Sequence, residues 1–460
     1  MRRKSPARFR TGSHRPAHLV YADRKGRLYD HPHLLMVGIA GEDPTIPDAE
    51  ELVSVPHGSD FYTLPGRRPM GLDPATGKLE VLDGAFDAVS VFLAPAWVRL
   101  RHPAFQVGEG APTLPLYAYA PMGFRNGEFV TTAARVDPEP RQDPWRFDLE
   151  DIAARVAARR AASPENRLVA QLDRCALEYG CRAAQNYFLG RFEAPLPTSE
   201  GCNAMCVGCI SLDPVNTTAA HERIVKSPSA EEIAEVALEH IAAVPRAVVS
   251  FGQGCEGEPL LRAEVLDAAI RIMRASTPSG TINLNSNASR PEQVERLCAA
   301  GLDSIRISLN SVQPDLYARY YRPRNYTFED VRESARVMRR NGRWISLNYL
   351  IFPGVTDLEQ EIEALEDFIG EVHVDMIQMR NLNIDPVLYR GLVGAGRHGD
   401  GIGFLALMAR LRAKFPWLRF GYFNPPKESW ADGPGPITHP ANQPPKGYVP
   451  AGLKRTAMAT

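Results

Sequence analysis

The sequence predicts an α/β protein in which a parallel sheet follows a β-rich segment and a helical connector. Three observations carry this prediction. Short apolar runs separated by Gly, Pro and Asp fill residues 31–146. Residues 147–192 show apolar residues at helical spacing. From about residue 193, six strand-like runs alternate with helical segments, a pattern that favours either a barrel or an open doubly wound sheet.

Length and composition exclude several classes of protein. The 460 residues suffice for two to four domains of roughly 100–200 residues each. The 53 Lys and Arg balance the 54 Asp and Glu, which argues against a protein built mainly to coat nucleic acid or an anionic membrane. No apolar run approaches the ~18 residues of a membrane span, and no apolar core follows the basic N-terminus. We therefore expect a soluble, cytoplasmic protein without a membrane partner.

Both ends of the chain have biased compositions. Nine Lys and Arg fall in the first thirty residues, which favours a solvated basic leader over a nucleic-acid arm. Eight prolines fall in residues 425–460, a composition that predicts a draping or disordered tail without a packed element. The expected parts are a basic leader (1–30), a small β-rich domain (31–146), a helical connector (147–192), an α/β domain (193–423) and a Pro-rich tail (424–460).

Within the β-rich segment, turn residues separate the candidate strands. Asn126-Gly127 predicts a tight hairpin, and Asp73 to Gly77 predicts a second turn before Lys78. The apolar runs are Leu34–Ala40, Val89–Leu93 and Leu114–Ala120. No catalytic motif is visible among them. The aromatic residues of this segment are expected to form a core more than a binding platform: Trp97, Tyr117, Tyr119 and Phe124.

In the helical connector, Ser163-Pro164 is expected to cap and open a helix. Four residues then follow at helical spacing: Leu168, Leu172, Cys175 and Tyr179. Cys181 lies six residues after Cys175, so the two thiols should face different sides of that helix as ordinary buried cysteines.

The α/β segment supplies its own boundaries. The expected strands are Ala194–Thr198, Ala247–Gly252, Thr281–Asn285, Ser304–Leu309, Trp344–Ile351 and Val374–Met379. Ser229 with Glu232 predicts a capping box that opens a helix. Ser289 with Glu292 predicts a second helix start, and Gly301 its end. Residues 358–372 form the third expected helix.

Three of the seven cysteines are spaced C-x3-C-x2-C just after the first strand of this series: Cys202, Cys206 and Cys209. A structural zinc site would need a fourth ligand, yet the next histidine, His221, has no partner at knuckle spacing. Three thiolates suit a [4Fe–4S] cluster that leaves one iron without a protein ligand. Three free thiols or an incomplete zinc site remain the alternatives.

The glycines after the second strand, Gly252, Gly254 and Gly257, spell G-x-G-x-x-G, which invites a dinucleotide-binding interpretation. Two features argue against it. Pro259 would fall inside the helix that should receive the pyrophosphate, and the next strand ends in Asn-Ser-Asn without an acidic residue for a ribose.

On these residues, the segment 193–423 resembles the radical S-adenosylmethionine (radical SAM) superfamily, whose signature is this C-x3-C-x2-C. The resemblance implies a partial (β/α)6 barrel of parallel strands with one [4Fe–4S] cluster on the three cysteines. Gly208 departs from the pattern, because the family usually has an aromatic residue just before the third cysteine.

The resemblance also implies which residues contact SAM. Gly257-Glu258-Pro259 looks like the family's G-E-P element, which receives the methionine ammonium. The remaining implied contacts, near the ends of later strands, are Ser286, Asn287, Ser308, Asn310, Asn348 and Gln378. Cys255 could face the substrate, the cluster or only its own loop, whereas Cys298 is expected in helix packing.

The implied activity is reductive cleavage of SAM to a 5′-deoxyadenosyl radical that abstracts hydrogen from a substrate. It requires a one-electron reductant such as flavodoxin or ferredoxin. None of the other cysteines lies beyond Cys298, which predicts one cluster. The substrate is open between a small metabolite, a peptide or protein side chain, and RNA. The competing hypothesis is a metal-binding interaction protein on a degenerate barrel without catalysis.

Overall fold

A computed structural model describes residues 15–212 and 222–448 of the chain. Residues 1–14 of the expected leader, His221, and residues 449–460 of the expected tail lie outside the described residues. The chain divides into two compact units. The first comprises Met1–Arg135, Phe352–Glu359 and Asn381–Leu407, and the second comprises Val136–Ile351, Gln360–Arg380 and Met408–Thr460. The five parts expected from the sequence stay a prediction.

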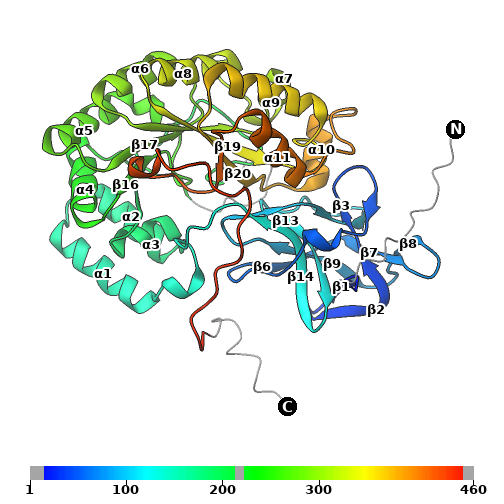
Figure 1. Ribbon diagram of the computed structural model, residues 1–460. Helices are drawn as coiled ribbons and strands as arrows, with labels where there is room; N and C mark the ends of the chain where they lie inside the picture. The colour runs from blue at the N-terminus through cyan, green and yellow to red at the C-terminus, as the bar shows by residue number, and fades with distance from the viewer. Residues whose placement is uncertain (1–14, 213–221, 449–460) are drawn as a thin grey trace. The chain divides into compact units, whose positions relative to one another are not determined.

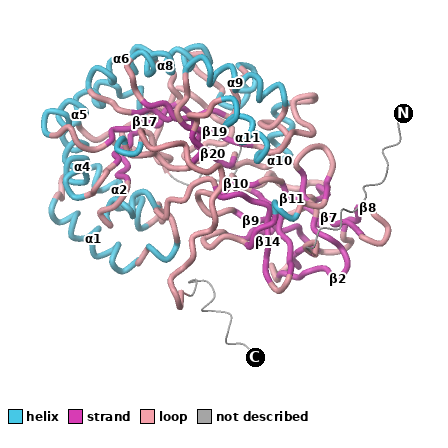
Figure 2. The backbone as a smooth tube through the Cα atoms, viewed as in Figure 1, coloured by secondary structure: helices cyan, strands magenta, loops and turns pink. Residues whose placement is uncertain are grey.

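The first unit is mostly antiparallel sheet, as Figure 2 shows by its magenta strands. The main sheet runs in the order β10-β14-β13-β9-β1-β2-β7-β12, with β5, β6 and β8 paired to β14, β9 and β7, and β11-β3-β4 form a second sheet. The main-sheet strands are β1 (His18–Asp23), β2 (Leu28–Met36), β5 (Leu52–Ser54), β6 (Asp60–Leu64), β7 (Arg67–Asp73), β8 (Lys78–Val81), β9 (Phe86–Phe92), β10 (Trp97–Arg99), β12 (Phe105–Val107), β13 (Tyr119–Arg125) and β14 (Glu128–Arg135). The second sheet consists of β3 (Gly38–Ile39), β4 (Pro44–Thr45) and β11 (His102–Pro103). Helix α10 (Pro386–Val393) also belongs to this unit.

Both predicted turns of this unit are confirmed. Asn126 and Gly127 have φ of 53° and 84° between the paired residues Arg125 and Glu128, as a tight hairpin requires. Asp73 pairs with Lys78 across the β7–β8 turn. The predicted strand over 114–120 is wrong in its first half, since β13 begins only at Tyr119. Pro115, which has no N–H to donate, interrupts that run.

Three helices open the second unit: α1 (Leu149–Ala162), α2 (Arg167–Leu177) and α3 (Arg182–Phe188). Ser163-Pro164 does not open a helix, contrary to the prediction. Ser163 is the C-cap of α1, while the Asn166 side chain caps α2 by accepting from Val169 N at 3.1 Å. Asn166 also donates to the Glu232 carbonyl at 3.1 Å, a distant contact that favours this later start.

The expected placement of Cys175 and Cys181 on opposite sides of one helix is also wrong. Helix α2 ends at Leu177, and Cys181 is the N-cap of α3. The chain turns back between them, because Cys181 N donates to Cys175 O at 2.9 Å. Cys175 itself is buried, as predicted.

A curled, seven-stranded parallel sheet follows in strict chain order, which confirms the predicted α/β class and the partial barrel of parallel strands. Its strands are β15 (Glu193–Pro195), β16 (Val248–Phe251), β17 (Thr281–Ser286), β18 (Ser304–Leu309), β19 (Trp344–Ile351), β20 (Met376–Asn381) and β21 (Arg419–Gly421). The helices that alternate with them are α4 (Ala230–Ala243), α5 (Ala263–Ser276), α6 (Pro291–Ala300), α7 (Pro314–Tyr321), α8 (Phe328–Arg340), α9 (Glu359–Val372) and α11 (Phe404–Lys414). In Figure 1 helices α4, α5, α6 and α8 line the outside of this curve. The three-residue β21 was missed.

Successive residues of these strands face opposite sides of the sheet. Buried aliphatic residues such as Val249, Ile305 and Leu347 alternate with polar ones. The polar set is Ser250, Asn283, Asn285, Arg306, Ser308, Asn348 and Gln378. Hydrogen bonds join neighbours within this polar set, for example Asn283 to Ser250 at 3.2 Å. The sheet therefore packs an apolar face on its helices and keeps a polar inner face.

Two of the three helix boundaries predicted from capping residues in this unit are confirmed. The capping box of Ser229 with Glu232 is present at α4, and Gly301 ends α6 with φ of 116°. Ser289 does not cap α6, contrary to the prediction, because the helix starts after Arg290 with a proline in its first turn. The Ser289 hydroxyl instead accepts from Asn203 Nδ2 at 2.8 Å.

The tail contains a packed turn, so the prediction of no packed element is wrong for residues 427–430. A 3-10 turn spans Lys427–Ser429, and the Trp430 ring stacks on Trp344 with centroids 5.0 Å apart. Arg419 holds the turn by donating to the Ser429 and Trp430 carbonyls, both at 2.9 Å. Among the described residues, no helix has the length and apolar character needed to cross a membrane.

Candidate functional site

The three motif cysteines lie in the loop after β15, here called the cysteine loop (residues 196–211). Backbone hydrogen bonds tie its middle to the end of α7. Met205 N donates to Tyr321 O at 3.0 Å and Val207 N to Tyr320 O at 2.9 Å. Arg324 N donates to Asn203 O at 2.8 Å. The loop is therefore held at both sides of Cys206 by main-chain contacts.

The three thiols are half-buried and lie close enough to influence each other. Burial, and then the negative charges of Cys202 and Cys209, raise the pKa of Cys206 well above its usual value. Burial, and then the Glu258 carboxylate, raise the pKa of Cys202. Arg223 Nη2 lies 3.8 Å from the Cys209 sulfur. A cationic iron core would relieve this repulsion between thiolates, so the donor set fits a cluster.

A single metal ion and a cluster place different demands on their ligands. Across residues 15–212 and 222–448, no three His, Cys, Asp or Glu side chains gather around one point that could hold an ion. A structural zinc needs four ligands at about 2.3 Å or less from one centre. A [4Fe–4S] cluster is larger and takes each cysteine on a different iron, so its ligands need not converge on one point. The cluster on Cys202, Cys206 and Cys209 stays a prediction, which the iron analysis below tests.

A second loop, here called the glycine loop (residues 252–258), packs its backbone directly against the cysteine loop. Gly257 N donates to Ser199 O at 2.6 Å, and Glu258 N donates to Gly201 O at 2.7 Å. A Cβ atom on Gly257 would lie 1.8 Å from Gly201 O. Only glycine permits this approach. Gly257 thus joins the two loops.

We expect Gly257→Ala to destabilise the protein by about 1–3 kcal/mol, because the added methyl group must push the two loops apart. It should also reduce iron retention after reconstitution, since Cys202 follows Gly201 directly. Guanidinium-chloride unfolding and iron analysis measure both effects. Gly391→Ala is the matched control, because a Cβ there meets nothing within 4 Å. Unchanged stability and iron content in Gly257→Ala would contradict the assignment.

Glu256, which the sequence did not single out, binds both loops at once. Its Oε2 accepts from Thr198 N at 2.7 Å and Ser199 N at 2.8 Å. Its Oε1 accepts from Gly252 N at 2.8 Å and Gln253 N at 2.7 Å. Burial raises the pKa of Glu256 to about 7, while these four N–H groups act to lower it. The only sequence signal was an acidic residue in a glycine-rich turn, which is common on surfaces.

Glu258 meets two of the residues predicted with it. Its carboxylate accepts from the Ser286 hydroxyl at 2.6 Å, from Asn287 N at 2.9 Å and from Leu260 N at 3.0 Å. Burial raises the pKa of Glu258, whereas these hydrogen bonds act to lower it. The end of β17 and the glycine loop are therefore connected through one buried carboxylate.

Asn203, another residue that the sequence did not indicate, links the cysteine loop to the end of β17. Its Oδ1 accepts from Asn287 Nδ2 at 2.9 Å, and its Nδ2 donates to Ser289 Oγ at 2.8 Å. A position inside the motif was the only available signal. Asn203 and Glu258 together connect Cys202 and its neighbours with the predicted Ser286 and Asn287.

The other predicted site residues fall into separate groups. Asn348 Nδ2 donates to Ser308 Oγ at 3.2 Å, so these two meet across β18 and β19. Gln378 is fully buried and donates to Asn424 Oδ1 at 2.8 Å. Asn310 is also fully buried, and its Nδ2 donates to Leu316 O at 3.2 Å. Gln378 thus forms its hydrogen bond inside the barrel. Asn310 forms its hydrogen bond with the first turn of α7.

Cys255 faces the helical connector. It is buried, and a hydrogen bond with Cys175, followed by burial, raises the pKa of Cys255. The charge of a Cys181 thiolate acts in the same direction, so the three thiols are neighbours. Cys298 is buried in α6 against the Met338 sulfur at 3.4 Å, as expected of a packing residue.

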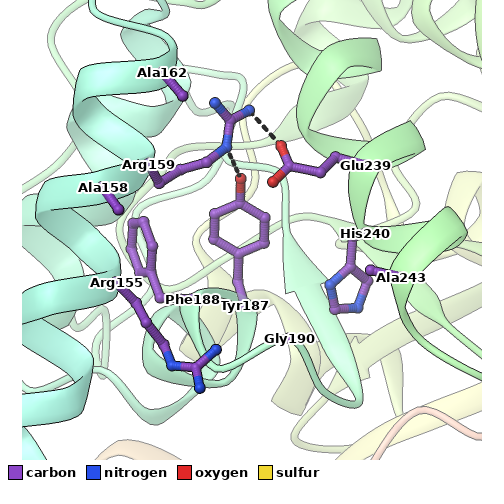
Figure 3. A pocket seen from close by; sticks show the side chains of 10 residues that line it. All are labelled: Arg155, Ala158, Arg159, Ala162, Tyr187, Phe188, Gly190, Glu239, His240 and Ala243. Atoms are coloured by element: carbon purple, nitrogen blue, oxygen red, sulfur yellow. Dashed lines mark hydrogen bonds and ion pairs between the residues drawn. The ribbon is translucent and has the colours of Figure 1, made fainter.

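A pocket of about 400 Å³ lies elsewhere in this unit, between α1, α3 and α4. Figure 3 shows Arg159 directed at Tyr187 and Glu239. Arg159 Nε donates to the Tyr187 hydroxyl at 3.0 Å and pairs with Glu239 at 2.7 Å. His240 Nε2 lies 3.2 Å from Phe192 O. These groups are satisfied internally, so the loops described above remain the candidate site.

A match to a known protein family covers both loops. Residues 196–369 match the family model of the Radical SAM superfamily. These residues therefore form a radical SAM domain, a type of domain that uses a [4Fe–4S] cluster and SAM.

Individual relatives match the chain in part. A probable GTP 3′,8-cyclase of Methanosarcina mazei is 30% identical over 164 residues, which are 34% of this chain and 47% of that protein. The GTP 3′,8-cyclase of Marinobacter nauticus is 27% identical over 182 residues, 39% of this chain and 51% of that protein. The chain thus spans about half the length of these curated relatives. A radical SAM methyltransferase structure from Sphaerobacter thermophilus aligns with a TM-score of 0.36 and 16% identity, over 53% of this chain and 69% of that one.

Proposed function

We propose that this chain cleaves SAM reductively at one [4Fe–4S] cluster, held by Cys202, Cys206 and Cys209, to generate a 5′-deoxyadenosyl radical that abstracts hydrogen from a substrate. The observation that carries the proposal is the pair of backbone hydrogen bonds between the cysteine and glycine loops. They bring Glu258, the expected SAM contact, beside Cys202, the proposed cluster ligand. The negative charge of Glu258 contributes to the raised pKa of the Cys202 thiol.

Glu258 has the capacity to receive the SAM ammonium. An ionised carboxylate offers about four acceptor sites, and three donors of the protein occupy this one. We propose that the remaining site accepts from the ammonium. Ser286 and Asn287 would meet the methionine carboxylate, and Ser308 with Asn348 would contact the ribose. Asn310 and Gln378 were also expected as SAM contacts. They would instead hold the inner wall of the barrel in place through their hydrogen bonds to Leu316 and Asn424.

Anaerobic reconstitution with iron and sulfide tests the proposal. We expect about four irons and four sulfides per chain, and conversion of SAM to 5′-deoxyadenosine after reduction by dithionite or by flavodoxin or ferredoxin. A full cluster without cleavage would favour the alternative of a metal-binding interaction protein. Product formation by a chain without iron would also contradict the proposal.

The substrate can be sought by the fate of its hydrogen. Because two curated relatives are GTP 3′,8-cyclases, GTP is the first candidate that we propose to test. A deuterated substrate should transfer deuterium to 5′-deoxyadenosine. Absence of transfer from labelled GTP would exclude it and leave the other metabolites, peptides and RNA to be tested in the same assay.

We expect Glu258→Gln to retain the cluster but to weaken SAM binding about 10- to 100-fold. The substitution keeps the size of the side chain and removes a charged hydrogen bond worth about 1.5–3 kcal/mol. Equilibrium binding of SAM to the reconstituted protein measures the effect. Glu264→Gln is the control, since the Glu264 side chain is 88% exposed. Wild-type affinity in Glu258→Gln would remove this residue from the SAM site.

A further inference from the structure

Two arginines lie on the polar inner face of the parallel sheet. Arg306 is on β18 two residues before Ser308, and Arg380 is on β20 two residues after Gln378. Residues two apart on a strand face the same side. Arg306 Nη1 donates to Gln378 Oε1 at 3.2 Å, so side chains from β18 and β20 meet on this inner face.

Within residues 15–212 and 222–448, no carboxylate lies in direct contact with this positively charged pair. Neither guanidinium forms an ion pair with a carboxylate in the described part of the chain, and the Nε of each is buried without a hydrogen-bond partner there. Arg380 Nη2 donates to the Tyr422 carbonyl at 2.6 Å and stacks 3.6 Å from the centre of the Tyr422 ring. Burial, and then the charge of Arg380, lower the pKa of Arg306 to about 9. Buried cations without partners are costly.

The acidic side chain that acts on Arg306 is already engaged. Glu193 Oε2 accepts from Arg141 at 3.3 Å, and its Oε1 accepts from Asn424 at 2.8 Å. Both Arg306 and Arg380 nevertheless remain partly accessible. The arrangement leaves two partly exposed guanidinium groups without a carboxylate partner in the described part of the chain.

We propose that Arg306 and Arg380 bind an anionic group, a phosphate or a carboxylate, of a small-metabolite substrate. A guanidinium presents parallel N–H donors that match both groups. The proposal rests on the proposed function, because Ser308, the expected ribose contact, is two residues from Arg306 on the same face. The anionic group of the substrate would then lie beside bound SAM.

Calorimetric titration of the reconstituted full chain tests the proposal, with pyrophosphate and succinate as probes and sodium chloride at matched ionic strength as the blank. We expect one of the two anions to bind, and Arg306→Gln or Arg380→Gln to weaken it at least about tenfold. Arg306→Lys keeps the charge and should recover part of the affinity. Arg332→Gln, on the outer helix α8, should match wild type. Binding of pyrophosphate alone assigns a phosphate, and binding of succinate alone assigns a carboxylate.

Two results would overturn the proposal: neither anion binds, or both Gln variants bind as wild type does. The formation of 5′-deoxyadenosine without substrate is measured on the same samples. If wild type binds the anion through these arginines but does not cleave SAM, the proposed function fails while the anion site stands. If it cleaves SAM but binds neither anion, only the anion site fails.

Discussion

Replacing Cys206 with Ala should abolish both the cluster and the cleavage of SAM. Cys206 is the middle ligand, and main-chain hydrogen bonds on each side hold it in place. Two thiolates would remain, too few for a cluster that already has one iron without a protein ligand. We expect iron retention and 5′-deoxyadenosine formation to fall by more than about 100-fold, since loss of a ligand exceeds the 10- to 100-fold effect of supporting groups.

The control for this variant is Cys298→Ala, which removes a buried thiol in α6 outside the cysteine loop. It should keep the cluster and lower stability only modestly, because a single buried atom is lost. Iron and sulfide analysis with anaerobic absorption spectra distinguishes the two variants. If Cys206→Ala kept a full complement of iron, the ligand assignment would be refuted, and Cys255→Ala would show whether the buried Cys255 thiol had replaced it.

Local patterns predicted the fold well wherever a residue's partners lie near it in sequence. Asn126-Gly127 determines its own turn, and the strand Trp344–Ile351 was predicted to the residue. Distant partners account for the errors. The helix begins after Asn166 and not at Ser163, because the Asn166 side chain also donates a hydrogen bond to α4. The proline-rich tail has a packed turn because Trp430 stacks on Trp344, 86 positions earlier in the chain. The amino-acid composition of the tail does not indicate this contact.

The candidate site divides in the same way. The cysteine spacing and Gly257-Glu258 are contiguous in sequence, so their chemistry could be proposed in advance. Glu256 and Asn203 could not be identified, because their partners lie 58 and 84 residues away. The orientation of Cys255 depends on Cys175, on another helix. Spacing within one loop indicates which atoms are available, whereas the fold determines which of them meet.

Glu256→Ala should be among the most destabilising single substitutions in this unit. Its two carboxylate oxygens each satisfy two backbone N–H groups, one pair in each loop. Removing the carboxylate would leave two buried and two partly buried donors without this partner, and each buried one costs about 1–3 kcal/mol. We therefore expect a loss of at least about 3 kcal/mol in the free energy of unfolding, measured by guanidinium-chloride denaturation of the protein without its cluster.

Glu256→Gln separates this role from simple packing. The amide keeps the size of the side chain and one acceptor oxygen, but its NH2 group cannot accept from the second pair of N–H groups. Its stability should fall between wild type and Glu256→Ala, with faster amide hydrogen exchange confined to one of the two loops. Glu264→Ala, at an exposed position, should show neither effect. Equal stability of Glu256→Ala and wild type would mean that water replaces the carboxylate. The registration of the cysteine and glycine loops would then depend on Gly257 and Glu258 alone.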